Sequence, residues 1–289
     1  MKTKVVMLGT GTPNPVPERS GPCVAIVVGE SSYLVDIGSG VTRQAQKAVQ
    51  EGITGLKVGN LKRAFITHLH SDHTLGFADL ILTPWVLERS EPLIVFGPQG
   101  TKEMTRMLLN AYQVDINARI NGLEQANKVG IQVDSHEILE GLIYEDELVK
   151  VEAIKVNHPP FEAYAYKFIT PDKTIVISGD TAPCDNLIKQ AKGCDILVHE
   201  VYSSTGIKKR DAKWHKYHST VHTSSLDLGQ IANKINPRLL ILYHQLFMVD
   251  ENETGDGQAL ITREQEMIQQ IKQGFKGTIV SAKDIQVFE

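Results

Sequence analysis

Three histidines and an aspartate fall within the six positions from residue 68 to residue 73, in the segment THLHSDHTLG (67–76). The order His–x–His–x–Asp–His offers imidazole nitrogens and a carboxylate, the donors that zinc and similar divalent ions bind. A catalytic zinc ion normally has three protein ligands and keeps one position for water, so four donors predict more than one metal ion. The candidate ligands here are His68, His70, Asp72 and His73.

Further donors follow apolar runs later in the chain. VNHPP places His158, ISGDT places Asp180 and LYHQ places His244 after strand-like residues. Seven donors from several strand ends predict a dinuclear centre, in which a bridging carboxylate, Asp180, lowers the repulsion between two cations. Four histidines lie outside this pattern and are expected to be ordinary structural residues, namely His136, His199, His215 and His218.

Two bound divalent ions predict hydrolysis. A water molecule shared by two such ions is acidic enough to be hydroxide near neutral pH. We therefore expect a metal-bridged hydroxide as the nucleophile, with Asp72 orienting it by a hydrogen bond while also binding metal. The ions would neutralise the charge that develops on the substrate oxygens.

The candidate ligands follow short predicted strands early and late in the chain, with helices between. Apolar, β-branched runs predict strands, and spacing near 3.6 predicts helices at 74–90, bent or broken at Pro84, and at 224–235, with 101–129 helical or irregular. The pattern favours an α+β fold, one domain (1–289) built of two strand-rich halves, with two sheets packed together and helices outside. The predicted strands are 4–9, 23–29, 32–38, 63–68, 93–98, 148–157, 163–170, 174–180, 195–200 and 238–244, with 277–288 closing the chain.

Composition limits the class of protein. The chain has 289 residues, 42% hydrophobic and 22% charged, with a net charge of −4. No apolar run reaches the length of a membrane span, and the N-terminal apolar stretch is too short for a signal peptide, so we expect a cytoplasmic protein. The scattered cysteines, Cys23, Cys184 and Cys194, fit a reducing compartment and form no CxxC pair for zinc. The negative net charge does not favour nucleic-acid binding by the chain as a whole.

A glycine pair follows the first predicted strand in LGTGTPNP. Gly9 and Gly11 match the start of a dinucleotide-binding fingerprint, but Asn14 stands where the third glycine belongs. A tight turn at the rim of the active site is the favoured interpretation.

Taken in order, LGTGTP, VDIGSG, THLHSDH, NHPP, SGDT, HE and LYH resemble the motifs of the metallo-β-lactamase superfamily over nearly the whole chain. The resemblance implies a four-layered αββα sandwich with two metal ions, zinc or alternatively manganese. It also implies the ligand sets: His68, His70 and His158 for one ion, Asp72, His73 and His244 for the other, and Asp180 as the bridge.

Within the superfamily the chain resembles the ribonuclease Z branch. There a His-Glu motif and a His-Ser-Thr-like motif place a glutamate against a histidine that assists the leaving group, which implies catalytic roles for Glu200 and His222. The second motif is imperfect, because His222 is followed by Thr223 and Ser224, while HST itself begins at His218. The spacing from His222 to His244 favours His222.

The substrate has several interpretations. The arm that clamps transfer RNA in ribonuclease Z has no room in the 22 residues between His158 and Asp180, and PVPERS keeps only Pro15 and Arg19 of the loop pattern Pro-x-Lys-x-Arg-Asn. The N-terminal text resembles the arylsulfatase-like members of the branch more closely. We expect a hydrolase of a small anionic ester, a phosphodiester or an aryl sulfate. The alternatives are a transfer RNA 3′-processing endonuclease and a lactonase or thioesterase.

Other members of the superfamily fit less well. Non-catalytic scaffold members usually lose ligands, and all seven are present here. A redox diiron relative would carry glutamate at the second histidine of the motif, where this chain has His70. The resemblance also implies a homodimer.

The segment IKKRDAKWHKYH (207–218) mixes basic and aromatic side chains between Glu200 and His222. It is expected to be a loop near the mouth of the pocket. It would either capture an anionic or aromatic substrate, RNA among the possibilities, or form an ordinary solvated surface.

Overall fold

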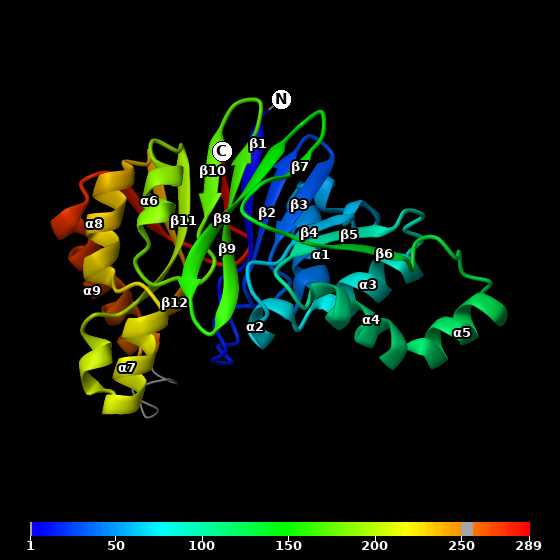
Figure 1. Cartoon of the computed structure of the whole chain (residues 1–289), viewed down its shortest axis with the longest axis horizontal. Coiled ribbons are helices and arrows are strands. Elements are labelled where there is room, and N and C mark those ends of the chain that lie inside the picture. Colours follow the sequence, from blue (N-terminus) through cyan, green and yellow to red (C-terminus); the bar gives the residue numbers. More distant parts are fainter. Residues whose placement is uncertain (1, 250–256) are drawn as a thin grey trace. The chain divides into compact units, whose positions relative to one another are not determined.

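The computed structural model describes residues 2–249 and 257–289. The chain divides into two compact units. The described residues up to Leu139, together with Thr170–Asp172 and Lys283–Glu289, make the first unit, and Glu140–Ile169 with the described part of Lys173–Ala282 makes the second. Each unit carries one seven-stranded sheet with helices of its own (Figure 1).

The sheet of the first unit has the order β14-β1-β2-β3-β4-β5-β6. The pairs from β14 to β3 are antiparallel and those from β3 to β6 are parallel. Its strands are β1 (Thr3–Gly9), β2 (Cys23–Val28), β3 (Ser31–Val35), β4 (Arg63–Phe65), β5 (Leu93–Gly97), β6 (Val133–Glu137) and β14 (Val287–Phe288).

The sheet of the second unit has the order β13-β12-β11-β10-β9-β8-β7 and repeats this pattern, with parallel pairs from β13 to β10 and antiparallel pairs from β10 to β7. Both sheets are therefore mixed, with helices in each unit, and the fold is of the α+β class. The strands are β7 (Gly141–Glu145), β8 (Lys150–His158), β9 (Phe161–Ile169), β10 (Thr174–Ile177), β11 (Ile196–Tyr202), β12 (Leu239–Leu246) and β13 (Thr278–Ser281).

Helices accompany the parallel part of each sheet. The first unit contains α1 (Val41–Gln50), α2 (Ser71–Thr74), α3 (Phe77–Val86), α4 (Thr101–Ala111) and α5 (Gln113–Asn121), with short 3-10 turns η1 (Thr54–Leu56) and η2 (Val58–Asn60). The second contains α6 (Asp185–Ala191), η3 (Gly206–Lys209), α7 (Ala212–Val221), α8 (Ser225–Ile235) and α9 (Gly257–Gly274). No helix in the described ranges combines the length and hydrophobicity needed to cross a membrane.

Each unit has its own apolar core. Alternate residues of a strand point to the same face, and in β2 the residues Cys23, Ala25 and Val27 pack with apolar side chains of α1 and α3 in the first core. In the second unit Leu240 and Leu242 of β12 join a core with residues of α6, α8 and α9. These two cores hold the strand ends that carry the candidate site.

Helices α8 and α9 lie side by side in the second unit (Figure 1). Gly229 of α8 lies against the backbone of α9, and a Cβ atom there would be 2.7 Å from the Ile271 carbonyl oxygen. Small residues at the contact allow this close approach, which fixes the helix that follows His222.

The predicted strands are present, but two expectations need correction here, and two further strands were not predicted. Pro84 does not end its helix, because α3 continues to Val86. Proline cannot donate to the carbonyl four residues earlier, and here the Arg89 guanidinium donates to Leu80 O at 3.0 Å instead. The predicted loop 207–218 is largely helix, with η3 followed by α7. Strands β6 and β7 had no predicted counterpart, because their side chains are mostly polar or exposed.

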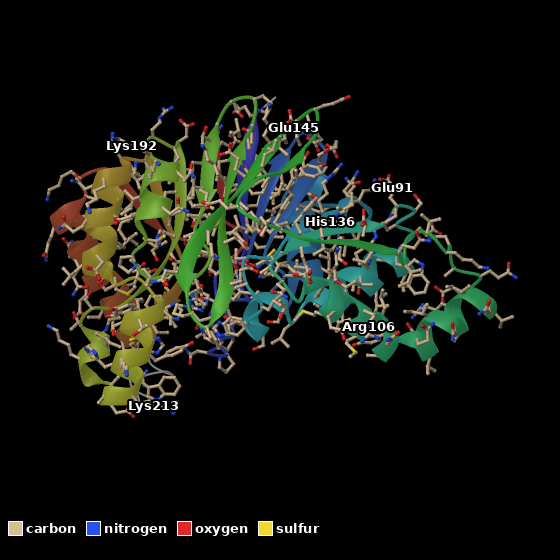
Figure 2. All side chains as sticks on the ribbon, viewed as in Figure 1. Glu91, Arg106, His136, Glu145, Lys192 and Lys213 are labelled. Atoms are coloured by element: carbon tan, nitrogen blue, oxygen red, sulfur yellow. The ribbon has the colours of Figure 1, made fainter. Side chains whose placement is uncertain are left out.

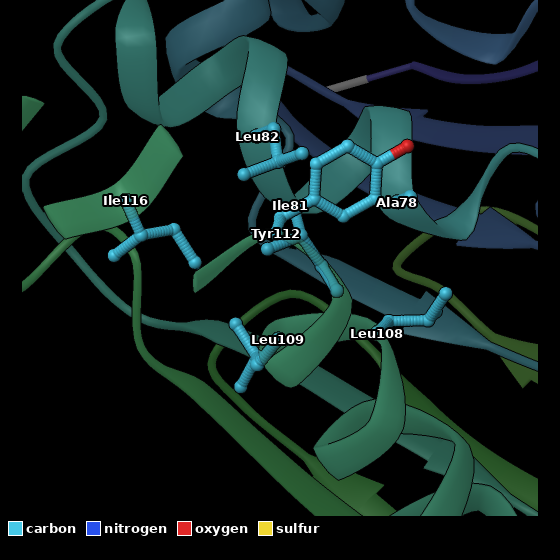
Figure 3. A pocket seen from close by; sticks show the side chains of 7 residues that line it. All are labelled: Ala78, Ile81, Leu82, Leu108, Leu109, Tyr112 and Ile116. Carbon is cyan, nitrogen blue, oxygen red and sulfur yellow. The ribbon is translucent and has the colours of Figure 1, made fainter. Parts of the chain in front are cut away.

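An apolar pocket lies between α3, α4 and α5 in the first unit (Figure 3). Its lining contains no charged side chain, and the Tyr112 hydroxyl is the one side-chain heteroatom in it. Ligand sites with chemistry need several convergent polar groups, so we place the candidate site elsewhere. The lining residues are Ala78, Ile81, Leu82, Leu108, Leu109, Tyr112 and Ile116.

Candidate metal centre

The predicted donors of the first unit follow β4. This strand ends at Phe65, so His68 and His70 lie in the loop beyond it. The prediction that they lie on the strand end is therefore wrong. His68 is fully buried. The structure brings these two donors together, with His68 Nε2 2.9 Å from His70 Nδ1. Two nitrogens on one tetrahedral zinc ion are about 3.3 Å apart, so this pair suits a shared ion.

Asp36, at the end of β3, holds this loop. Its carboxylate accepts hydrogen bonds from the Thr67 backbone N–H at 2.8 Å and the Thr67 hydroxyl at 2.9 Å, and its other oxygen lies 2.8 Å from His73 Nδ1. Asp36 is buried and has a φ of 62°, a left-handed conformation that aspartate tolerates better than most residues. It therefore ties the start of the loop to the last histidine of the motif.

The same bonds orient the ring nitrogens. The Thr67 hydroxyl donates its one proton to Asp36, so it accepts from His68 Nδ1–H, 3.0 Å away. His73 likewise gives its Nδ1–H to Asp36. In both rings the lone pair is then on Nε2, the form that binds metal. His73 Nε2 lies 3.5 Å from Asp72 Oδ2, a second pair of donors.

His158, the last residue of β8, carries the same kind of support in the second unit. Its Nδ1 lies 2.8 Å from the Val221 carbonyl oxygen, so Nε2 again has the lone pair. Burial lowers the pKa of His158, although the Asp180 carboxylate opposes this effect. The lowered pKa keeps the imidazole neutral and able to act as a ligand. Donor atoms of His158 and Asp180 lie within 4.8 Å of each other.

His244 is presented by a bulge in β12. Tyr243 pairs with Glu200 and Gln245 with Val201, so His244 is the extra residue between two regular pairs. It has a φ of 42°. A bulge redirects the side chain it carries, and here His244 Nδ1 lies 3.5 Å from Asp180 Oδ1. The prediction that His244 lies at a strand end is wrong, because the strand continues to Leu246.

Glu200 and His222 form a buried pair in the second unit. Glu200 Oε1 lies 3.3 Å from His222 Nδ1 and accepts the Thr223 backbone N–H at 2.9 Å. His222 Nδ1 is also 3.8 Å from Asp180 Oδ2. Glu200 is fully buried and His222 is 5% exposed. This carboxylate is positioned to hold the imidazole beside Asp180.

The four histidines outside the motif have varied surroundings. His136 is half-buried on β6, 3.1 Å from Asp134 Oδ2 (Figure 2). His199 is buried with Nδ1 2.7 Å from the Glu200 carbonyl oxygen, and His215 is exposed on α7. His218 contacts the ring of His222 with centroids 5.5 Å apart, so it is nearer to the candidate catalytic group than the sequence analysis expected.

The glycine pair of LGTGTPNP serves the backbone. A Cβ atom on Gly9 would lie 1.8 Å from the Gly21 carbonyl oxygen, and one on Gly11 would lie 2.6 Å from that of Ser20. Only glycine allows this approach. The close packing supports the structural interpretation over nucleotide binding.

Sequence reasoning missed the residues that orient the ligands. Asp36 and Thr67 are the main examples. Thr223 holds Glu200 and the residue after Asp180, with its backbone N–H donating to Glu200 Oε1 at 2.9 Å and its hydroxyl to the Thr181 carbonyl oxygen at 2.6 Å. Asp36 left one signal, an acid that ends a buried apolar strand and precedes glycines in VDIGSG. The partner of His158 is a backbone carbonyl and leaves no signal in side-chain types.

The donor chemistry of both units fits divalent metal ions. Zinc and similar ions usually bind imidazole nitrogens and carboxylates. Hydrogen-bond acceptors behind the imidazoles orient the rings, as the buried acceptors do here. The residues present therefore suit the predicted cofactor.

The chain is similar to known proteins along most of its length. A family model described as anti-Pycsar protein Apyc1 matches residues 3–268. Ribonuclease Z from Mycobacterium bovis (strain BCG / Pasteur 1173P2) is 30% identical over 266 residues, which cover 90% of this chain and 92% of that protein.

Two solved structures show the fold. The metallo-β-lactamase fold protein YhfI from Bacillus subtilis aligns with a TM-score of 0.74 at 19% identity, covering 100% of both chains. The short form of human tRNase Z aligns with a TM-score of 0.70 at 21% identity, covering 99% of this chain and 98% of that chain. These matches confirm the predicted metallo-β-lactamase fold.

Proposed function

The chain belongs to the family of the anti-Pycsar protein Apyc1 and is a hydrolase of the ribonuclease Z-like branch of the metallo-β-lactamase superfamily, and we propose that it cleaves phosphodiester bonds with two divalent metal ions. The name of the ribonuclease Z relatives supports this bond type, because a ribonuclease acts on phosphodiesters. No relative reported above is named for a sulfate ester, although the sequence analysis favoured both ester classes.

We propose the ligand sets that the sequence resemblance implies. Bound zinc or manganese ions would supply an activated water molecule and positive charge for the developing oxyanion. One ion would take His68, His70 and His158, the other Asp72, His73 and His244, and Asp180 would bind both. Within each unit, the oriented Nε2 atoms and adjacent carboxylates support this assignment.

The chain's own residues would then divide the remaining work. The Asp72 carboxylate can orient the attacking hydroxide by accepting a hydrogen bond from it. The His222 imidazolium can donate a proton to the leaving oxygen, and Glu200 stabilises that positive charge and fixes the ring by its contact with Nδ1. With Nδ1 turned toward Glu200, Nε2 is the nitrogen that delivers the proton.

One observation carries the proposal most directly: the buried Glu200–His222 pair beside Asp180. A hydrolase of carbonyl esters would use the metal ions without needing this pair. Phosphodiesters with alkoxide leaving groups need a proton donor, because the leaving oxygen is strongly basic.

The test is the ratio of kcat/KM on bis(p-nitrophenyl) phosphate to kcat/KM on p-nitrophenyl sulfate, with the zinc- or manganese-loaded protein. Asp180→Ala serves as the control for contaminating activity. We expect a clear preference for the phosphodiester. A preference for the sulfate would establish the arylsulfatase-like interpretation, and failure on both with metal bound would leave the carbonyl esters.

Transfer RNA 3′ processing remains a second candidate, favoured by the 30% identity to a ribonuclease Z along 90% of the chain. Strands β9 and β10 occupy the segment between His158 and Asp180, as the sequence analysis expected, so this segment contains no arm. Cleavage of precursor transfer RNA in the same assay distinguishes this candidate. The homodimer implied by resemblance is a further proposal, which sedimentation tests against the chain mass of 32.0 kDa.

A further inference from the structure

Glu200 holds one atom of His222, the proposed proton donor, but this contact does not set the plane of the ring. Glu200 Oε1 lies 3.3 Å from His222 Nδ1, whereas N–H···O hydrogen bonds are usually about 2.7–3.2 Å long. The torsion that sets the plane of a histidine ring has broad minima, so the side chain itself tolerates a range of tilts. A proton reaches the leaving oxygen only when the donor nitrogen points at it. The plane of the His222 ring therefore needs support from other residues.

The ring of His218, on α7, gives this support (Figure 1 labels the helix). His218 precedes His222 by four residues, a spacing that brings side chains together on a helix. The centroids of the two imidazoles are 5.5 Å apart, with an interplanar angle of 30°. One turn earlier, Trp214 contacts His218 in the same way, with centroids 5.9 Å apart at 29°. A row of tilted or stacked rings along α7 therefore ends at His222.

Two proposed metal ligands also contact the His222 ring. The centroid of His158 lies 5.2 Å away at 62°, and that of His244 lies 6.0 Å away at 23°. The orientation of these two rings is already set by their proposed role as ligands. His218 belongs to neither ligand set, so its contact with His222 has no such explanation.

The imidazole of His218 is not kept for its hydrogen bonds. Its Nδ1 is buried and has no hydrogen-bond partner among the residues that the structure describes, which is an unfavourable arrangement for a polar atom. Burial, and then the nearby His222, lower the pKa of His218 to about 4, so the ring is neutral near neutral pH. A neutral ring does not repel the imidazolium that His222 forms, as a second cation would. What remains for His218 is contact through its ring.

We propose that His218 is a positioning residue, whose ring contact fixes the plane of the His222 imidazole so that Nε2 points at the leaving oxygen. This inference rests on the proposed phosphodiester activity and on the role of His222 as its proton donor. Glu200 holds one atom of the His222 ring and His218 holds its plane, so the two residues restrict different motions. His218 needs no contact with the substrate.

The kinetic test compares two diesters that differ in the basicity of the leaving group, methyl p-nitrophenyl phosphate and methyl phenyl phosphate. His218→Ala should lower kcat about tenfold for the phenyl ester, whose leaving oxygen needs a proton, and should leave kcat for the p-nitrophenyl ester and both KM values nearly unchanged. His218→Phe should restore most of the loss, because it keeps a ring. His215→Ala, which removes an exposed imidazole of the same helix, is the matched control. Equal losses on both esters, no loss, or a phenylalanine variant as slow as the alanine variant would overturn the inference.

A structural measurement separates this inference from the proposed activity. Crystal structures of the metal-loaded proteins should show one orientation of the His222 ring in the wild type, and a rotated ring or several orientations in His218→Ala. A single, unchanged orientation in the variant would overturn the inference whatever the kinetics show. If the metal-loaded wild type hydrolyses neither ester, the proposed phosphodiesterase activity fails, whereas a rotated His222 ring in the variant would still establish that His218 sets its plane.

Discussion

Asp36 Oδ2 lies 2.8 Å from His73 Nδ1, and both side chains are almost fully buried. The same carboxylate accepts two hydrogen bonds from Thr67. Asp36 therefore sets the tautomer of His73, a proposed ligand, and the path of the loop that carries three further proposed ligands.

Asp36→Asn should lower the affinity for zinc about 10- to 100-fold, because the amide cannot orient His73 by accepting through both oxygens. Chelator competition measures this affinity. Asp79→Asn is the matched control, since Asp79 is a carboxylate of the same unit that accepts from Thr42 and Thr83 at 2.5 and 2.6 Å and contacts no histidine in these bonds. Equal losses in both variants would contradict a specific role for Asp36.

His222→Ala should slow the cleavage of phosphodiesters with alkoxide leaving groups about 10²- to 10⁴-fold, since these need a proton. The loss should be much smaller for p-nitrophenyl esters, whose leaving group is a weak base. The plot of log kcat against leaving-group pKa measures the difference. Parallel plots for the wild type and the variant would show that His222 acts in some other way. His215→Ala, on the same helix and exposed, controls for changes in α7.

The backbone conformation at His244 predicts that a glycine variant is more stable than an alanine variant. Glycine in a strand is ordinarily less stable than alanine by about 0.5–1 kcal/mol, but at a φ of 42° an alanine is strained. We expect the free energy of unfolding of His244→Gly, from urea denaturation of metal-free protein, to exceed that of His244→Ala by about 1 kcal/mol. The opposite order would mean that the bulge relaxes when the imidazole is removed.

His218 should make the protein less stable in acid. Burial, and then the nearby His222, lower its pKa from 6.5 to about 4. The unfolded chain therefore binds more protons between these values, so stability falls as pH drops from about 6.5 toward 4. His218→Asn should remove this part of the fall, measured by urea unfolding at each pH. His215→Asn, on the exposed part of the same helix, should leave the slope unchanged, and an unchanged slope in both variants would refute this account.

The ligand motif and most strands could be predicted from sequence, because histidines in His–x–His–x–Asp–His order and β-branched apolar runs are local signals. The helical state of 212–221 was not predicted, since its large apolar side chains are mostly aromatic, exposed and mixed with lysines, and only Val221 is buried. The bulge at His244 depends on the pairing of β12 with β11, which no local pattern encodes. Asp36 and the Val221 carbonyl act over 37 and 63 residues of separation, so their roles appear only when the chain is folded.

The central claim is that two metal ions act in phosphodiester cleavage. Its most direct test is to titrate the metal-free protein with zinc or manganese and to record the rate of bis(p-nitrophenyl) phosphate hydrolysis per equivalent added. We expect most activity to appear with the second equivalent and to reach a plateau at two ions per chain. A plateau at one ion, or two bound ions without hydrolysis, would contradict it.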